Sequence, residues 1–299
     1  MAIPQTQIAA ALPPTGASPD AKLLIRSDYP VPNPAEDEVL IKFEYSGVCH
    51  SDVHSVRGET PMLTDVAGHE GVGKVVKEYI VSPAVHVTKI PPQLAPDTAA
   101  PLLCAGIAMY SSIMKTKTRP GDWIVLPGAG GGLGHMGVQI AVKKGLKVIA
   151  IDSGEKKKQL CLSLGATSFF DYKVQDVEKE VLALTSGLGA HAVICTANSE
   201  PAYTQSMRML RRLGVLVCVG IPSVPFKLPA TPFDMIVKGL TIVGNSAGTA
   251  KEMDELMEMA VAGEVKAHIE CFSFSEIENV LQRLGRSEID GRAVVKIPE

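Results

Sequence analysis

Hydrophobic and polar positions follow two different patterns along the chain. In the first third, residues 38–46 (EVLIKFEYS) alternate between apolar and polar, which is typical of a half-buried β-strand, and short valine-rich segments follow between Gly and Pro residues. From about Trp123 onward, short apolar segments alternate with longer segments of helical spacing. The pattern therefore predicts a β-rich first part followed by an α/β part.

The second part is predicted to alternate strands with helices. The predicted strands are 124–126, 146–151, 192–196, 215–219 and 240–243, and the predicted helices are 136–144, 155–164, 177–184 and 200–213. Gly145 follows the first of these helices, at a position where glycine commonly ends a helix. Such interleaving favours a parallel, doubly wound sheet. After Thr249 an amphipathic helix leads to a final strand, 292–297, which we expect to return to the first domain.

Composition narrows the function classes. The chain has 299 residues, 46% hydrophobic and 20% charged, enough for two linked domains. A formal net charge of -3 and a pI near 6.2 argue against a nucleic-acid partner, which would require a surplus of Lys and Arg. The first twenty residues have neither a basic start nor a long apolar run, so we expect no signal peptide, no membrane anchor and a cytoplasmic location. Six cysteines without paired short spacings indicate reduced thiols or metal ligands rather than a disulfide framework.

A glycine-rich segment lies between a predicted strand and a predicted helix. The run Gly128-Ala-Gly-Gly-Gly-Leu-Gly134 can expose backbone N–H groups and a helix N-terminus to a pyrophosphate. The dinucleotide fingerprint fits in two frames, one on residues 132, 134 and 137 and one on residues 129, 131 and 134. We prefer the second frame, which places Gly131, Gly132, Leu133 and Gly134 against the cofactor. A glycine turn that only packs a helix on a sheet is the alternative.

An acidic residue stands at the end of the next predicted strand. Asp152 comes eighteen positions after Gly134, where a carboxylate accepts hydrogen bonds from both ribose hydroxyls and repels a 2′-phosphate. The sequence therefore predicts NAD, rather than NADP, as the cofactor.

A second cluster of reactive residues occupies the β-rich part. It runs Gly47-Val-Cys-His-Ser-Asp-Val-His54 and is followed by Gly68-His-Glu70. Thiolate and neutral imidazole are preferred zinc ligands, and a catalytic zinc needs three protein ligands and one open position. Spacing alone leaves open whether Cys49 and His69 bind a metal or are a buried cysteine and a hydrogen-bonded core histidine.

Several strings taken together resemble a known family. GVCHSDVH, GHEGVG, PLLCAGI, the GAGGGLG turn followed by AID, and the closing GRAVVKI are similar to the zinc-dependent medium-chain alcohol dehydrogenases of the yeast and fungal branch. The similarity covers nearly the whole chain in order. It implies a GroES-like catalytic domain over 1–106, shortened in this chain, a Rossmann NAD-binding domain over 107–248, and a return to the catalytic domain over 249–299.

The resemblance also implies roles for individual residues. The catalytic zinc ligands fall on Cys49, His69 and Cys104, with Glu70 as a nearby carboxylate that can approach the metal. Ser51 matches the hydroxyl that takes the alcohol proton, and His54 the residue that relays it towards solvent. His50 and Arg292 match positions at the cofactor pyrophosphate, and Lys157 one near the adenosine ribose. For these residues the alternative is a turn or exposed surface position.

Two departures from the family pattern affect the expectation. Family members carry several tens more residues between GHEG and PLLCAGI, including a four-cysteine lobe for a structural zinc, so we expect one catalytic zinc and no structural zinc. The missing segment is expected to leave the barrel of the first domain incomplete. The bulky tryptophans that follow the relay histidine are replaced here, with Val56 and Thr60 in that region, which predicts a substrate larger than ethanol.

The sequence thus predicts an NAD-dependent oxidoreductase that exchanges hydride with an alcohol, aldehyde or ketone, with a homodimer or homotetramer as the expected assembly. Two alternatives stay open. One is a zinc-free enoyl or quinone-type reductase of the same superfamily. The other is a relic that binds dinucleotide without turnover.

Overall fold

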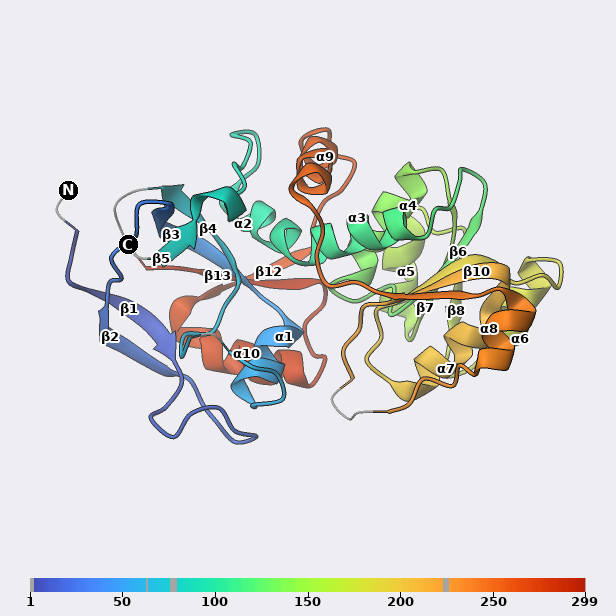
Figure 1. The fold of residues 1–299 in the computed structure, drawn as a ribbon, viewed down its shortest axis with the longest axis horizontal. Coiled ribbons are helices and arrows are strands. Elements are labelled where there is room, and N and C mark those ends of the chain that lie inside the picture. The colour runs from blue at the N-terminus through green and yellow to red at the C-terminus, as the bar shows by residue number, and fades with distance from the viewer. Residues whose placement is uncertain (1–2, 63, 76–79, 223–225, 299) are drawn as a thin grey trace. The chain divides into compact units, whose positions relative to one another are not determined.

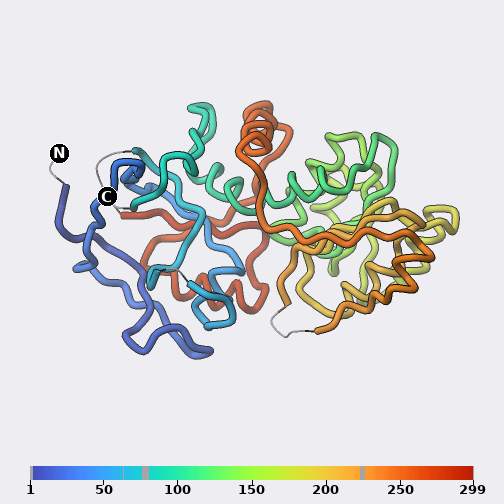
Figure 2. Tube along the Cα trace, in the orientation of Figure 1, coloured from blue at the N-terminus to red at the C-terminus, as the bar shows by residue number. Residues whose placement is uncertain are grey.

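The chain forms two compact units. The computed structural model describes residues 3–62, 64–75, 80–222 and 226–298. The first unit comprises Met1–Cys104 and His268–Glu299, and the second comprises Ala105–Ala267. In Figure 2 the C-terminal segment, in red, runs back among the blue N-terminal strands. The second unit is therefore inserted between two parts of the first.

A six-stranded parallel sheet forms the centre of the second unit (Figure 1). The strands are β6 (Trp123–Pro127), β7 (Lys147–Asp152), β8 (Ser168–Asp171), β9 (Ala190–Cys195), β10 (Leu210–Cys218) and β11 (Thr241–Gly244). Their order is β11-β10-β9-β6-β7-β8, and each neighbouring pair is parallel. The strand order reverses at β6, since β7 lies on one side of it and β9 on the other. The predicted doubly wound fold is confirmed, and such a reversal is where open α/β sheets bind ligands.

Seven helices are described in the second unit. They are α3 (Ala105–Lys115), α4 (Gly134–Lys143), α5 (Glu155–Ser163), α6 (Val177–Leu184), α7 (Glu200–Met209), α8 (Pro232–Lys238) and α9 (Ala250–Val261). The sequence analysis groups 249–299 with the return to the first domain, whereas α9 lies in the second unit. Helix α9 contacts α3, and the hydroxyl of Tyr110 donates a hydrogen bond to Glu255. Packing of its apolar face on α3 therefore keeps α9 with the parallel sheet.

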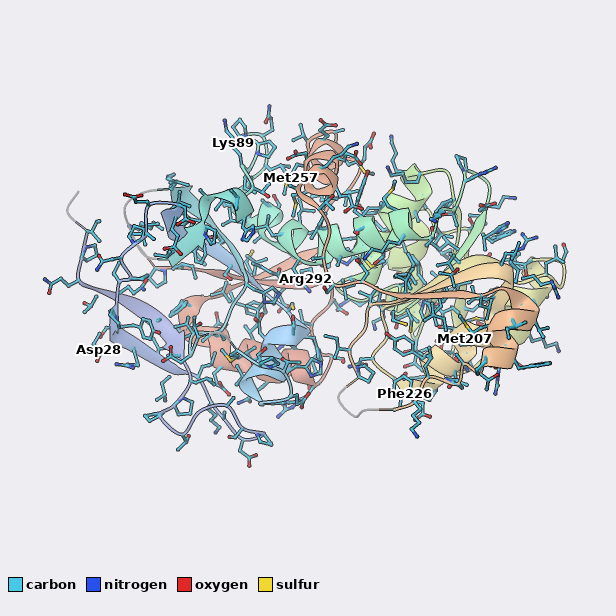
Figure 3. All side chains as sticks on the ribbon, viewed as in Figure 1. Asp28, Lys89, Met207, Phe226, Met257 and Arg292 are labelled. Carbon is cyan, nitrogen blue, oxygen red and sulfur yellow. The ribbon has the colours of Figure 1, made fainter. Side chains whose placement is uncertain are left out.

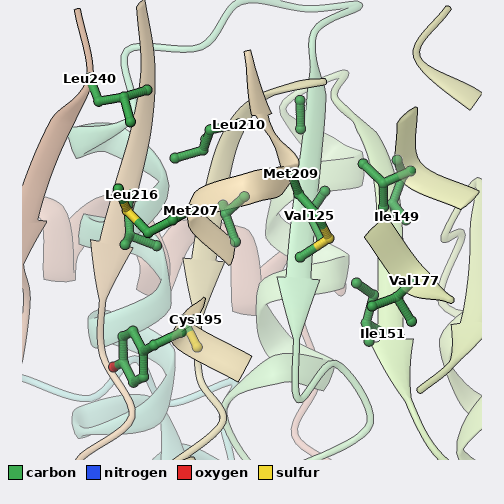
Figure 4. Packing of buried hydrophobic residues seen from close by; sticks show 14 residues of the cluster. Val125, Ile149, Ile151, Val177, Cys195, Met207, Met209, Leu210, Leu216 and Leu240 are labelled. Carbon is green, nitrogen blue, oxygen red and sulfur yellow. The ribbon is translucent and has the colours of Figure 1, made fainter. Parts of the chain in front are cut away.

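The core of the second unit follows from the apolar strand segments. Val125, Ile149, Val193 and Leu216 come from four adjacent strands and pack against side chains of α6 and α7. Figure 4 shows the cluster, with Met207 and Val177 among its members. Strands of a parallel sheet are covered on both faces, which explains their nearly continuous apolar sequences.

The first unit is built from two sheets. The strands are β1 (Thr6–Ala11), β2 (Leu24–Pro30), β3 (Glu38–Val48), β4 (Glu70–Val75), β5 (Ile80–Pro83), β12 (Ile269–Ser273) and β13 (Arg292–Lys296), and the helices are α1 (His50–Val56), α2 (Pro96–Ala99) and α10 (Ile277–Gly285). β1 pairs with β2, while the other sheet has the order β12-β13-β3-β4 with β5 also on β3. The C-terminal strand β13 pairs antiparallel with β3, as the predicted return requires. A cavity of about 790 Å³ in this unit is lined by residues of β1, β2, β3, β13 and α10.

Some elements differ from the predicted ones. The helix predicted over 200–213 ends at Met209, because Leu210 already pairs with Ala190 of β9. Exposed Leu213 then adopts a φ of +60° within β10, where the register with β9 shifts between Leu210 and Val215. The sequence analysis identified none of α1, α3, α8, α10, β8 and β12. Several of these are short, or in the case of α3 apolar around most of the helix, so their periodicity is weak.

The glycine-rich turn connects β6 to α4. A methyl group at Gly134 would lie 2.1 Å from the carbonyl oxygen of Gly128 and 2.5 Å from the Cα of Ala129. Both are backbone atoms, so this contact cannot be relieved by a side-chain rotation. The N-terminus of α4 is therefore packed directly on its own preceding loop, and only glycine fits there.

This contact leads to a stability prediction. Gly134→Ala should lower the free energy of unfolding by about 1–3 kcal/mol, because the loop must shift to admit the methyl group. It should also weaken NADH binding at least tenfold, measured by fluorescence titration alongside thermal unfolding. Gly244→Ala is the matched control for the stability effect, since a methyl group there has no heavy atom within 4 Å. Equal behaviour of the two variants would contradict this account of the loop.

Candidate functional site

Two thiols and an imidazole from distant parts of the sequence meet in the first unit. The Nε2 atom of His69 lies 3.4 Å from the Sγ of Cys49 and 3.3 Å from the Sγ of Cys104. With Glu70, these residues offer ligand atoms that all lie within 4.8 Å of one another. No other such group of three or more His, Cys, Asp or Glu residues occurs among the described residues. The arrangement has the donor types and the size of a zinc site.

Strand pairing places these side chains at one end of a sheet. Gly47 of β3 pairs with Glu70 at the start of β4, and Val48 pairs with Ala293 of β13. Cys49 therefore follows directly after β3, beside the first residues of both neighbouring strands. Cys104 comes from a different direction, at the end of a short 3₁₀ turn over 100–103.

A glycine is required where β3 passes the carboxylate of Glu70. A methyl group on Gly47 would lie 2.0 Å from the Oε2 atom of Glu70. The fully buried Glu70 side chain occupies the space that any other residue at position 47 would fill. The GVC string of the sequence thus has a packing reason as well as a chemical one.

Asp52 connects the start of α1 to the imidazole. Its Oδ2 accepts a hydrogen bond from the backbone N–H of Cys49 at 2.9 Å, which caps the helix. Its Oδ1 lies 2.9 Å from the Nδ1 of His69. A carboxylate at Nδ1 holds the proton on that nitrogen and leaves Nε2 free to bind a metal.

The protonation states follow from these contacts. A hydrogen bond from Cys104 holds the pKa of the Cys49 thiol well below its ordinary value, against the effect of burial. The same hydrogen bond, together with burial, raises the pKa of Cys104 well above its ordinary value. Burial lowers the pKa of His69, but hydrogen bonds and charges of Asp52 and Cys49 outweigh it and raise the pKa to about 11. The site therefore holds protons that a metal ion would displace.

Glu70 forms a buried ion pair with Arg292. The Nη2 of Arg292 donates a hydrogen bond to the Oε1 of Glu70, and both side chains are inaccessible or nearly so. Burial raises the pKa of Glu70 to about 7, although the Arg292 charge opposes this. The Oε2 of Glu70 and the Nε of Arg292 have no hydrogen-bond partner among the described residues. Figure 3 labels Arg292 within the strands of the first unit.

Three further predicted site residues lie on the first helix. The Oγ of Ser51 is 2.5 Å from the Sγ of Cys49, so the hydroxyl lies directly beside the cluster of thiols. His54 is buried one turn further along and contacts Glu59 through Nδ1. The rings of His50 and His54 have centroids 5.1 Å apart. Local helix geometry thus gathers all three residues next to Cys49.

The predicted dinucleotide residues come together in the second unit. The Oδ2 of Asp152 accepts a hydrogen bond from the N–H of Gly130 at 2.9 Å, which fixes the loop to the end of β7. Its Oδ1 accepts one from the Nζ of Lys157 at 2.9 Å. Gly131, Gly132 and Leu133 lie in the turn, and Gly134 begins α4. A second cavity of about 770 Å³ lies at the carboxyl ends of β10 and β11 in the same unit.

The two residues used to predict a large substrate have structural neighbours of their own. Val56 is buried in a core cluster with Val53 and Leu281, so its size affects this core. The hydroxyl of Thr60 lies 2.9 Å from that of Ser55. The structure therefore gives Val56 no exposed surface with which to shape a substrate pocket.

The sequence analysis assigned no role to Asp52 or Glu59. Asp52 could have been identified as the third residue after a helix cap, the position of an acidic capping-box residue. Glu59 had no such signal, because its contact with His54 depends on a turn at Gly58. No helix among the described residues is both long enough and apolar enough to cross a bilayer.

Two family models match the chain. Residues 35–90 match the alcohol dehydrogenase GroES-like domain, and residues 132–262 match the zinc-binding dehydrogenase model. These ranges hold His69, Asp152 and the glycine-rich turn from residue 132 onward.

Characterised relatives match over most of their length. Alcohol dehydrogenase 1 of Neurospora crassa is 33% identical over 91% of this chain and 93% of its own length. The alcohol dehydrogenase of Schizosaccharomyces pombe is 32% identical over 99% of both chains. The alignment with the Neurospora protein has 329 positions, and about 272 of them are occupied by residues of this chain. Roughly 57 residues of that relative therefore have no counterpart here.

Solved structures show the same fold. The alcohol dehydrogenase of Aeropyrum pernix superposes with a TM-score of 0.85 at 26% identity, over 97% of this chain and 100% of that one. Acetophenone reductase of Geotrichum candidum, solved in complex with NAD, has a TM-score of 0.85 at 22% identity over 99% and 98% of the two chains.

Curated alcohol dehydrogenases are over 30% identical to this chain across more than nine-tenths of their own length, and both domain models match in order. The chain therefore belongs to the zinc-binding alcohol dehydrogenase family.

Proposed function

We propose that this chain is an NAD-dependent alcohol dehydrogenase that holds one catalytic zinc on Cys49, His69 and Cys104. It exchanges hydride between NAD(H) and an alcohol, aldehyde or ketone. The observation that carries the proposal is the convergence on one small volume of these three side chains, of which Cys49 and Cys104 are 55 positions apart in the sequence.

The donor set fits zinc and leaves a position for substrate. Two sulfur ligands and one nitrogen ligand with a fourth position open is a known arrangement in zinc alcohol dehydrogenases. Glu70 is the fourth member of the cluster, and its Oε1 lies 3.8 Å from the Nε2 of His69. We assign Glu70 as a carboxylate that approaches the metal without being a permanent ligand, because its Oε1 is already bound to Arg292.

The chain's own groups then handle the proton. When bound, zinc supplies Lewis acidity at the substrate oxygen, and NAD accepts the hydride. The hydroxyl of Ser51 lies beside the Sγ of Cys49 and is placed to take the proton of an alcohol. His54, on the same face one turn along, receives that proton and passes it outward.

The cofactor is assigned to the second unit. Gly131, Gly132, Leu133 and Gly134 place backbone N–H groups at the pyrophosphate, and Asp152 binds the adenosine ribose. Lys157 already forms an ion pair with Asp152, so Lys157 and the ribose must share this carboxylate. His50 and Arg292 are assigned to the pyrophosphate side.

We also propose a substrate class and an assembly. The substitution of bulky residues near Thr60 supports a substrate larger than ethanol. Homodimer or homotetramer formation through β11 is supported by its edge position, which leaves a row of backbone groups unpaired, and by the exposed Phe233 and Ile236 of α8 in the same unit. A cytoplasmic location is supported by six free cysteines, two of which must stay reduced to bind metal.

Metal content and turnover test the proposal together. Protein purified without chelator should contain about one zinc per chain and oxidise bulky primary or secondary alcohols with NAD⁺, followed by NADH absorbance. Cys104→Ser should lose most of the zinc and more than about 99% of the turnover, because a hard hydroxyl replaces a thiolate ligand.

Cys271→Ser is the control, because Cys271 is exposed and is not a member of the cluster. Turnover that survives in zinc-free protein would favour a zinc-free reductase. NADH binding without turnover of any alcohol or carbonyl compound would favour a non-catalytic protein.

Zinc binding should release protons. At neutral pH His69 is protonated, since its pKa is near 11, and Cys104 is a thiol, since its pKa is raised. Both must lose a proton to bind the metal, so apparent zinc affinity should rise with pH by up to about a hundredfold per unit between about pH 6 and about pH 8. Calorimetry in buffers of different ionisation enthalpy would measure the proton release. An affinity that is flat across this range would exclude the assigned protonation states.

Asp152 should set the choice between NAD and NADP. Asp152→Asn removes the charge that repels a 2′-phosphate and weakens the hydrogen bonds to the ribose. The KM for NAD should rise about tenfold, corresponding to about 1.4 kcal/mol, while activity with NADP should increase. Asp254→Asn, on the exposed side of α9, is the control and should change neither value. An unchanged NAD to NADP ratio in Asp152→Asn would show that another group reads the ribose.

A further inference from the structure

His54 is a buried imidazole with a carboxylate partner that reaches solvent. The side chain of His54 is 4% exposed, and its Nδ1 contacts the Oε2 of Glu59, whose side chain is 31% exposed. A proton on a buried imidazole is costly unless an opposite charge lies beside it. Glu59 supplies that charge at Nδ1. The other ring nitrogen, Nε2, is left for a proton donor.

The turn after α1 builds this contact. Gly58 has a φ of +75°, a left-handed conformation that suits glycine and reverses the chain at the helix end. The N–H of Glu59 then donates to the carbonyl of His54 at 2.9 Å. The hydroxyls of Ser55 and Thr60 lie 2.9 Å apart across the same turn. Glu59 is thus held over His54 by backbone geometry and by a neighbouring side-chain contact.

Other charged groups near His54 are few and already engaged. His50 stacks at a tilt on His54, and burial, followed by the neighbouring imidazole of His54, lowers the pKa of His50. On α10, which packs against α1, Glu278 accepts a hydrogen bond from the N–H of Leu23, and Arg283 pairs with Glu270. Arg57 ends the helix and lies against Gly285 of α10. Among the described residues, Glu59 is the carboxylate with a hydrogen bond to His54.

We propose that Glu59 is a positioning residue for the proton relay: it fixes the tautomer of His54 with the proton on Nδ1, leaves Nε2 as the acceptor, and stabilises the imidazolium formed when the alcohol proton arrives. The proposal rests on the proposed function. With NAD⁺ bound, the cofactor would accept the hydride of the substrate C–H bond, and the O–H proton would pass through Ser51 to the Nε2 of His54. No further co-reactant is needed, because the imidazolium returns its proton to water.

This arrangement parallels the orienting carboxylate of a hydrolase triad. There the carboxylate touches neither substrate nor reacting atoms, yet it sets the tautomer of the histidine and favours its charged form. A surface ion pair that only stabilises the turn would leave the basicity of the relay unchanged. The two possibilities therefore differ in the pH dependence of the reaction.

Glu59→Gln tests the role while preserving the shape of the side chain. Gln leaves the imidazolium without an opposite charge beside it, so the acid limb of the kcat profile for alcohol oxidation should move to lower pH by about one unit. The weaker base should reduce kcat at the plateau about tenfold with KM nearly unchanged. Glu59→Asp, which keeps the charge, should recover part of both changes.

Glu44→Gln is the matched control, because Glu44 is a carboxylate of the same unit in an exposed pair with Lys74. Its profile should overlay that of the wild type. In a His54→Gln background, Glu59→Gln should have no further effect, since Glu59 acts through His54. An NMR titration of His54 in both forms, which needs no turnover, should show the same shift to lower pH.

The results separate this inference from the proposed function. If the wild type lacks zinc and turnover, the proposed function fails, and the NMR titration still decides whether Glu59 sets the basicity of His54. If the wild type is active but Glu59→Gln leaves the pH profile and the His54 titration unchanged, the inference is overturned. The inference would also be overturned if Glu59→Gln lowered kcat in the His54→Gln protein by as much as it does in the wild type.

Discussion

The antiparallel pairing of β3 with β4 and β13 is the constraint on which the site depends. It brings residues from positions 47–49, 69–70 and 292 to one end of a single sheet, although they are up to 245 positions apart. Backbone hydrogen bonds fix this register, and a shift by one residue would turn every side chain to the other face. Cys49 and Glu70 are therefore positioned by the sheet itself, and Cys104 completes the cluster from a separate turn.

The charged side chains of Glu70, Arg292 and Asp52 are buried at this site, and each lies beside a partner. The Glu70 and Arg292 pair is almost fully removed from solvent, and each keeps one polar atom without a partner among the described residues. Such a pair contributes little to stability by itself, and its value lies in holding charges in place. Asp52 links the same cluster to the helix that carries Ser51 and His54. The cluster of thiols and imidazole and the helix α1, which carries the residues proposed to handle the proton, are thus joined by the same carboxylate.

The first unit keeps this framework. Roughly 57 residues of the Neurospora relative have no counterpart in this chain, yet the strands that carry the cluster are present and paired. The unit contains a cavity of about 790 Å³ lined by β1, β2, β3, β13 and α10. The chain therefore retains the elements that position these side chains.

The sequence by itself determined the class of fold and the candidate site residues. Alternating strands and helices give the parallel sheet, because burial on both faces demands apolar strands, and the motifs identified Cys49, His69 and Cys104 by family resemblance. Only the tertiary structure decided that their side-chain atoms meet, that Arg292 pairs with Glu70, that Val56 is a core residue, and that Glu59 contacts His54. These facts depend on strand register, on α10 packing against α1, and on a left-handed glycine, all of which arise from contacts between distant segments or from a single backbone angle. A periodic pattern in a linear sequence does not record them.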